Sequence, residues 1–292
     1  MAEIGGVITA MVTPFTEDGS VDEAAARKLA RHLVESGCHG VVVAGTTGES
    51  PTLSDEEDMV LLRAVKDELG EQAVVVCGTG TNDTRHSEQL SAAAADNGAD
   101  AVLVVAPYYN KPNRAGIAAH FRAVAKAAGV PVIVYNIPSR VVVNIAPDLL
   151  AELGEIENVV AVKQANNDEI DEVEGLALLA GNDDVFLRCL EGGGAGGILV
   201  ASHLVGGEMR EIFDAVRSGE LDRAHEIDQR IRPIYEAMTI DTNPIPVKAA
   251  AELLGLIPSA RMRLPMVEAD RAQRETLRKA LENQGLLAAS TA

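Results

Sequence analysis

Cysteine is scarce in this sequence, and it has no long apolar run and no cluster of basic residues. The three cysteines, Cys38, Cys77 and Cys189, are odd in number and lack Cys-x-x-Cys spacing. We therefore expect neither a disulfide framework nor a structural zinc site, and a cytoplasmic, reducing location. No apolar run approaches the roughly 18 residues of a membrane-spanning helix, so we expect no membrane partner.

Positive charge is also in short supply. Acidic residues outnumber Lys and Arg, 44 against 25, and the formal net charge is -19. The basic residues are spread along the chain, so we expect no nucleic-acid partner. Residues 1–6 hold no basic segment followed by an apolar one, so we expect no signal peptide. The six histidines show no His-x-His or His-Glu-x-x-His spacing, and we expect no metal site.

Short apolar runs alternate with longer helical patterns through most of the chain. Most runs are continuously apolar and rich in valine, which is typical of parallel strands buried on both faces. Eight such units predict an α/β fold, a (β/α)8 TIM barrel, in residues 1–205; a doubly wound sheet is the alternative, but the even spacing favours closure. The runs are Gly6–Thr13, Gly40–Gly45, Ala73–Gly78, Ala101–Ala106, Pro131–Tyr135, Val159–Lys163, Leu176–Gly181 and Gly197–Ala201.

Helix signals lie between these runs and after the last one. Ser20 with Glu23, and Ser54 with Glu57, have capping-box spacing, and Pro147 suits a first helical turn. The connection between Lys163 and Leu176 has room for only a short helix. Residues 206–292 are expected to form a C-terminal helical appendage; its helices are predicted at Gly207–Arg217, Asp222–Met238, Val247–Leu254 and Glu268–Glu282.

Polar side chains follow several of the predicted strands, at the end of a barrel where active sites lie. The turn Gly45–Glu49 places two threonine hydroxyls between glycines, which suits a small anion, although a plain tight turn is the alternative. Three of the four tyrosines, Tyr108, Tyr109 and Tyr135, also stand at strand ends. A tyrosine hydroxyl needs a polar partner, so this concentration favours a function over core filling.

Lys163 is the most informative single residue, because it closes a buried strand while the other six lysines lie in helical or loop stretches. Burial lowers the pKa of a lysine, and a neutral amine forms Schiff bases with carbonyl compounds. The alternative is a lysine whose ammonium reaches the barrel rim. The glycine-rich segment Gly192–Gly197 fits Gly-x-Gly-x-x-Gly, but it precedes a strand, so we do not interpret it as a dinucleotide site.

The strand-end segments resemble those of the 4-hydroxy-tetrahydrodipicolinate synthase (dihydrodipicolinate synthase) family, class I pyruvate-dependent barrels of the aldolase type. They occur in the family's order and spacing nearly from end to end. They are Val12-Thr13-Pro14-Phe15, Gly45-Thr46-Thr47-Gly48-Glu49-Ser50, Pro107-Tyr108-Tyr109-Asn110-Lys111-Pro112, Tyr135-Asn136-Ile137-Pro138-Ser139-Arg140, Lys163, Asn243-Pro244-Ile245-Pro246-Val247-Lys248 and Arg263-Leu264-Pro265-Met266.

The resemblance implies a lyase that condenses pyruvate with L-aspartate 4-semialdehyde for lysine and diaminopimelate biosynthesis, without cofactor. Lys163 would form the Schiff base and Tyr135 would be the acid/base group. Thr46 would link Tyr135 to Tyr109, which reaches a neighbouring subunit's site in the family.

For substrate binding, the resemblance implies that Thr47 holds the pyruvate carboxylate and that Arg140 holds the carboxylate of the semialdehyde. The backbone of Gly181 and Ile198 would lie beside the substrate. A homotetramer, built as a dimer of dimers, would be the assembly.

Some positions depart from the family pattern. Val141-Val142 stands where Thr-Gly is usual, Gln164 and Asn166 follow the lysine, and Asn182 replaces an aspartate. Alternatives are therefore an N-acetylneuraminate lyase or a 2-keto-3-deoxy-sugar aldolase, and more remotely a barrel that binds a keto acid without turnover. Arg140 and the Tyr108-Tyr109 pair favour the synthase.

The resemblance also bears on regulation. Lysine-inhibited relatives bind L-lysine in a cleft between subunits, near positions that match Asp55, Asp58, His86 and Tyr108. They commonly carry a glutamate at the position of His86, where it receives an ammonium group. An imidazole offers no such anion, so we expect weak or absent inhibition by L-lysine.

Overall fold

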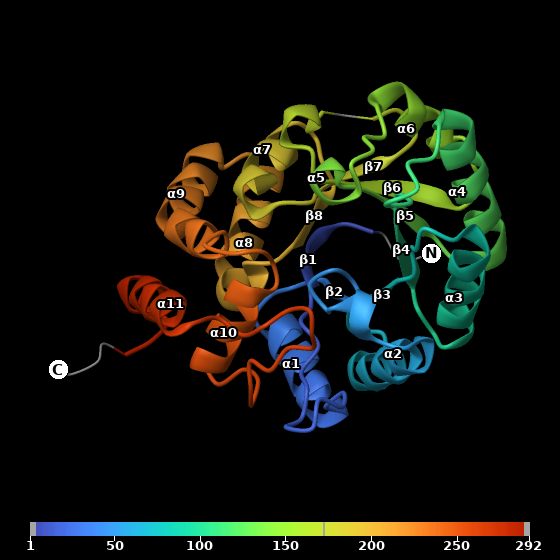
Figure 1. Ribbon diagram of the computed structural model, residues 1–292. Coiled ribbons are helices and arrows are strands. Elements are labelled where there is room, and N and C mark those ends of the chain that lie inside the picture. Colours follow the sequence, from blue (N-terminus) through green and yellow to red (C-terminus); the bar gives the residue numbers. More distant parts are fainter. Residues whose placement is uncertain (1–3, 172, 289–292) are drawn as a thin grey trace.

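The computed structural model describes residues 4–171 and 173–288; the parts of our predictions that fall on 1–3, 172 and 289–292 lie outside it. In the described residues eight parallel strands close into a barrel in sequence order (Figure 1), as the sequence predicts. They are β1 (Gly6–Ala10), β2 (Gly40–Val43), β3 (Val74–Gly78), β4 (Ala101–Val105), β5 (Val132–Asn136), β6 (Val159–Gln164), β7 (Ala177–Ala180) and β8 (Gly196–Leu199).

Helices surround the barrel because the valine-rich strands are apolar on both faces and must be covered on the outside. The helices of the barrel are α1 (Glu23–Glu35), α2 (Asp55–Leu69), α3 (Thr84–Asp96), α4 (Arg114–Ala128), α5 (Pro138–Val141), α6 (Pro147–Gly154), α7 (Phe186–Glu191) and α8 (Ser202–Arg217). Three 3-10 helices, η1 (Ser50–Thr52), η2 (Asn167–Glu169) and η3 (Asp183–Val185), complete the connections among the described residues.

Most helix signals in the sequence are confirmed, and one is wrong. Ser54 and Glu57 form the capping box of α2, and Pro147 opens α6. The cap of α1 is Asp22, whose side chain accepts a hydrogen bond from Ala25 N at 2.9 Å, and not Ser20. The Ser20 carbonyl instead accepts from the amide of Thr16 in a tight turn, which keeps Ser20 outside the helix.

The short connection after β6 matches the expectation from the sequence. Between β6 and β7 the described residues contain only the 3-10 helix η2, where the neighbouring units have α-helices. The start of this connection, with η2, lies at the mouth of the barrel, immediately after the strand that carries Lys163.

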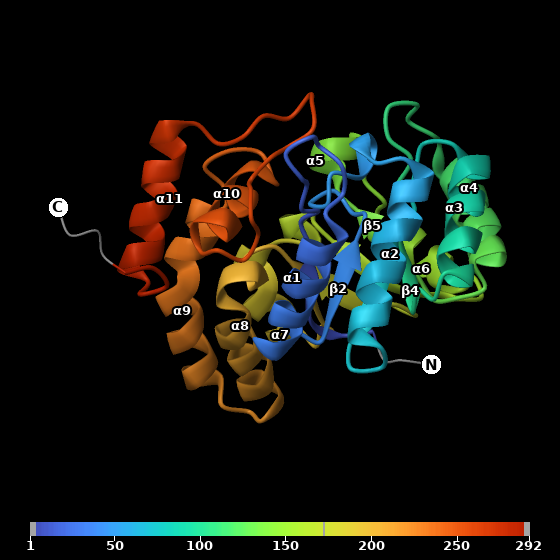
Figure 2. The same cartoon turned by 90° about the horizontal axis from the view of Figure 1, so that it is seen from below.

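The C-terminal region consists of α9 (Leu221–Ala237), α10 (Ile245–Leu253) and α11 (Arg271–Asn283). These helices pack on one another and on α8, at one side of the barrel (Figures 1 and 2). The boundary expected at residue 205 falls inside α8, which also packs against β1, so the division into 1–205 and 206–292 stays a prediction. No helix in the described ranges is both long and apolar enough to cross a membrane.

The glycine-rich segment serves the closure of the barrel. Gly196 pairs with Gly6 in the β1–β8 ladder, and a side chain at Gly196 would collide with the Gly6 backbone. This close approach is at the starting ends of the strands, away from the candidate site.

Candidate active site

Lys163 and Tyr135 face each other at the ends of adjacent strands. They are register partners in the β5–β6 ladder, and the Lys163 Nζ lies 4.3 Å from the centroid of the Tyr135 ring. Both side chains are nearly buried, at 5% and 6% exposure. The parallel register therefore brings together the lysine that the sequence singles out as a candidate nucleophile and the tyrosine that the resemblance implies as its acid/base group.

The burial of this pair changes its acid–base properties. Desolvation lowers the pKa of Lys163 to about 7; the charge of Asp183 opposes this shift and that of Arg140 adds to it. Desolvation likewise raises the pKa of Tyr135 to about 12, opposed by Arg140 and by a hydrogen bond with Thr46. Near neutral pH the amine is therefore partly neutral and the phenol is protonated.

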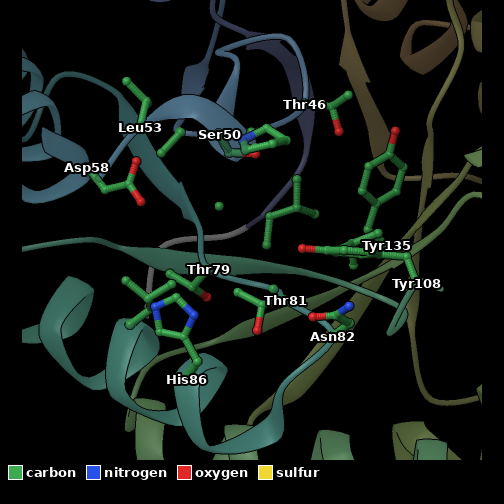
Figure 3. Close-up of a pocket in the computed structure, with 18 of the residues that line it drawn as sticks. Thr46, Ser50, Leu53, Asp58, Thr79, Thr81, Asn82, His86, Tyr108 and Tyr135 are labelled. Carbon is green, nitrogen blue, oxygen red and sulfur yellow. The ribbon is translucent and has the colours of Figure 1, made fainter. Parts of the chain in front are cut away.

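The two threonines lie on the turn that follows β2. The amide of Gly48 bonds to the carbonyl of Gly45, and Glu49 N bonds to Thr46 O at 3.1 Å. Figure 3 shows Thr46 and Tyr135 on one side of a pocket, with their hydroxyl ends near each other. Thr47 is 3% exposed and accepts a hydrogen bond from Asn243 Nδ2 at 2.9 Å.

Two cavities meet at Tyr135. One, of about 530 Å³, is lined by Thr47, Lys163, Gly181 and Asp183. The other, of about 420 Å³, is lined by Thr46, Asp58, His86 and Tyr108, among others (Figure 3). Tyr135, Ile137 and Arg140 line both. The larger cavity holds the candidate nucleophile, and we take it as the candidate active site.

Arg140 reaches over this cavity from the short helix α5. Its guanidinium donates to Asn243 O at 3.0 Å and leaves much of the side chain exposed. Gly181, at the end of β7, donates its amide to Gln164 O at 2.7 Å, and a Cβ at this position would crowd the same carbonyl. Glycine is thus needed where the backbone passes close to the end of β6.

Two predicted site residues are not among those that line either cavity. Tyr109 follows β4 with φ 71° and is 88% exposed, so its ring points away from its own barrel. Ile198 is fully buried in β8, where it pairs with Ile8. Val200, two residues further on, lines the larger cavity instead.

Two functional candidates escaped the sequence analysis. Asp183 lines the larger cavity, and its carboxylate accepts from Val200 N and Ala201 N at 2.9 and 3.0 Å. Asn243 holds the Thr47 hydroxyl, as described above. In the sequence, the segment around Asp183 drew attention only through Asn182, and Asn243 only as part of a motif that carries the resemblance. Neither residue closes a predicted strand, so the sequence pattern did not indicate a place in the site for either.

Two of the residues that depart from the family pattern, Gln164 and Asn166, take part in an amide network behind the site. Gln164 Oε1 accepts from Asn136 Nδ2 and from Asn166 N, both at 3.0 Å. The Asn136 side chain also donates to the carbonyl of Ile145 and accepts from its amide. The network thereby ties β5 and β6 together just beyond Tyr135 and Lys163, and it needs no ionised side chain there.

The sequence matches one family of known proteins over nearly its whole length. The family model described as "Dihydrodipicolinate synthetase family" matches residues 3–284. A protein of Desulforudis audaxviator named 4-hydroxy-tetrahydrodipicolinate synthase is 46% identical over 98% of this chain and 99% of its own.

Solved structures that resemble this chain are also dihydrodipicolinate synthases. Dihydrodipicolinate synthase from Cyanidioschyzon merolae with lysine bound is 39% identical, with a TM-score of 0.93, over 97% of this chain and 99% of that one. The chloride-inhibited enzyme from Acinetobacter baumannii with pyruvate is 35% identical, with a TM-score of 0.94, over 98% of this chain and 100% of that one. The chain belongs to the dihydrodipicolinate synthetase family.

Proposed function

We propose that the chain is a lyase that condenses pyruvate with L-aspartate 4-semialdehyde to give 4-hydroxy-tetrahydrodipicolinate, through a Schiff base on Lys163. The observation that carries this proposal is a buried lysine at the end of β6, 4.3 Å from a tyrosine ring, in a cavity of about 530 Å³. The relative named 4-hydroxy-tetrahydrodipicolinate synthase supports it. A solved relative with pyruvate supports the first substrate.

The first half of the reaction activates pyruvate. The neutral amine of Lys163 attacks the carbonyl carbon of pyruvate, and loss of water gives an iminium ion. The pyruvate carboxylate binds at Thr47. The iminium withdraws electrons from the methyl carbon, which releases a proton and leaves an enamine. Tyr135, hydrogen-bonded with Thr46, transfers protons at these steps.

The second half forms the carbon–carbon bond. The enamine carbon attacks the aldehyde, whose oxygen takes a proton, and the iminium on Lys163 is restored. The amino group of the semialdehyde then attacks the iminium carbon, closes the ring and releases Lys163 as the free amine. Arg140 binds the semialdehyde carboxylate through charge-assisted hydrogen bonds, and the backbone of Gly181 lies beside the substrate.

The active assembly is a homo-oligomer, a dimer at least and a tetramer built from two dimers. The exposed ring of Tyr109 supports this assignment, because an 88% exposed tyrosine at the mouth of the barrel is free to enter a second copy. In that copy it extends the hydroxyl chain of Thr46 and Tyr135. A cytoplasmic location is in keeping with the three cysteines, which are all unpaired buried thiols.

A turnover assay tests this function. Purified enzyme is mixed with pyruvate and, in turn, L-aspartate 4-semialdehyde, N-acetylmannosamine and sugar-derived aldehydes. We expect turnover with the semialdehyde alone. Turnover of N-acetylmannosamine with none of the semialdehyde would move the chain to the lyase branch, and pyruvate binding without any turnover would make it a keto-acid-binding barrel.

A further inference from the structure

A buried ion pair joins the C-terminal region to the turn that carries the two threonines. Lys248, on α10, donates from Nζ to Glu49 Oε1 at 2.5 Å, and the two side chains are 0% and 2% exposed. Glu49 ends the turn after β2 and has φ 61°, in the left-handed region. This non-glycine residue is thus kept in an uncommon backbone conformation by contacts to its side chain.

The surroundings of the pair satisfy both of its charges. The backbone amide of Arg263 donates to the second carboxylate oxygen of Glu49 at 3.0 Å. The Phe15 ring lies beneath both cations, with the Lys248 Nζ 4.1 Å and the Arg263 guanidinium carbon 4.6 Å from its centroid. The guanidinium of Arg263 in turn pairs with Glu57. Three separate sequence motifs thus converge on Glu49.

The same cluster holds the threonine turn from two sides. Thr13 Oγ1 donates to the carbonyl of Gly48 at 2.7 Å, and the amide of Glu49 itself bonds to Thr46 O. Asn243, five residues before Lys248, donates to Thr47 Oγ1. The segment 243–248 therefore contacts the turn at Thr47 and again at Glu49.

Stability alone does not account for a pair of this kind. Removing two charges from water is costly, and an apolar pair of similar volume is often equally stable or more stable. An ion pair, unlike an apolar contact, specifies the direction of its two side chains. Because this pair lies beside the threonine turn, the fixed direction of its two side chains bears on the position of that turn.

We propose that Glu49 and Lys248 are positioning residues that hold the Thr46–Thr47 turn in the conformation that receives the pyruvate carboxylate. The proposal rests on the function proposed above, because that function makes Thr47 the carboxylate site. It assigns to α10 a part in substrate binding, although none of the residues of this helix lines the larger cavity.

The test compares Lys248→Met with the control Lys66→Met. Lys66 is also a paired lysine, bonded to Asp100 at 2.8 Å, but Asp100 immediately precedes β4 and so lies at the opposite end of the barrel. We expect Lys248→Met to raise the KM for pyruvate about ten- to hundredfold, with a smaller change in the KM for the semialdehyde. Lys66→Met should lower the melting temperature and leave both KM values unchanged.

A second variant keeps the test decisive if Lys248→Met does not fold. Glu49→Gln preserves the shape of the side chain and an acceptor for the Arg263 amide but removes the charge, and we expect the KM for pyruvate to rise with it as well. Either folded variant with a wild-type KM for pyruvate overturns the proposal. Borohydride trapping on the wild-type enzyme separates the two hypotheses: no pyruvyl adduct at Lys163 refutes the proposed function, whereas an adduct with unaffected variants refutes only the positioning role.

Discussion

Lys163 and Tyr135 occupy paired positions in adjacent strands, and the amine nitrogen lies over the phenol ring. Burial removes water from the amine, while Thr46 provides the phenol with a hydroxyl partner. One strand pairing thus places a partly neutral amine beside a protonated phenol.

The first prediction concerns the site of the Schiff base. Incubation with pyruvate and borohydride should attach a reduced pyruvyl group to Lys163, because this lysine lines the larger cavity and its pKa is lowered to about 7. Peptide mass mapping locates the adduct. Lys248 is the internal control, since it is equally buried but bound to Glu49. An adduct on Lys248, or on no lysine, contradicts the mechanism.

The second prediction concerns pH. Only the neutral amine attacks pyruvate, so the trapping rate at low pyruvate should rise with pH through about 7 and then level off. Asp183 raises the pKa of Lys163, and Asp183→Asn should therefore move this profile toward lower pH. Asp184→Asn serves as the control, because its carboxylate is not among the charges that shift the lysine. A profile displaced to higher pH by Asp183→Asn would show that the assigned charge effect is wrong.

The third prediction concerns the second substrate. Loss of a hydrogen bond between charged groups costs about 1.5–3 kcal/mol, so Arg140→Ala should raise the KM for the semialdehyde roughly 10- to 150-fold. The KM for pyruvate should change less. Steady-state kinetics with each substrate varied in turn measure both effects, and Ser139→Ala, which alters the neighbouring residue on the cavity wall, is the control. An equal rise in both KM values would mean that Arg140 does not distinguish the two carboxylates.

The fourth prediction concerns Tyr109. Tyr109→Phe should lower kcat by about 10²-fold, because it removes one hydroxyl from a proton-transfer chain. The melting temperature should stay the same, since the side chain is 88% exposed. Tyr108→Phe controls for the loss of a neighbouring phenol. Sedimentation should show a dimer or tetramer, and a fully active monomer would be incompatible with this role.

The fifth prediction concerns feedback by L-lysine at the smaller cavity. His86 there is bonded to Asp55 at 2.9 Å and provides no anion of its own (Figure 3). We expect weak inhibition or none, and His86→Glu should strengthen it. The test is an initial-rate assay at saturating pyruvate with increasing L-lysine.

Asp58 is the residue that most directly challenges this prediction. It is 5% exposed, and its Oδ1 has no hydrogen-bond partner among the residues that the structure describes, while burial raises its pKa to about 7. An ionised Asp58 would offer an ammonium group the anion that His86 lacks. Half-inhibition below about 0.1 mM, near -5.5 kcal/mol of binding free energy, would show that the cavity functions without the glutamate.

The barrel was predictable from the sequence because its signals are local. Each strand is a short valine-rich run, and each run lies near the observed bounds, from Gly6–Ala10 to Gly196–Leu199. Strand order then requires no further information, since consecutive β-α units wind in one direction and pair with their neighbours. Lys163 and Tyr135 were predictable for the same reason, as polar residues at the ends of buried runs.

The tertiary structure alone decided which distant residues support these two. Asn243 meets Thr47 and Lys248 meets Glu49 across 196 and 199 positions of sequence, and no periodicity in the chain encodes such contacts. The start of α1 at Asp22 was likewise decided by a turn that engages Ser20. The pKa of Lys163 depends on burial and on the charges of Asp183 and Arg140, which are brought together from three strand ends only when the barrel closes.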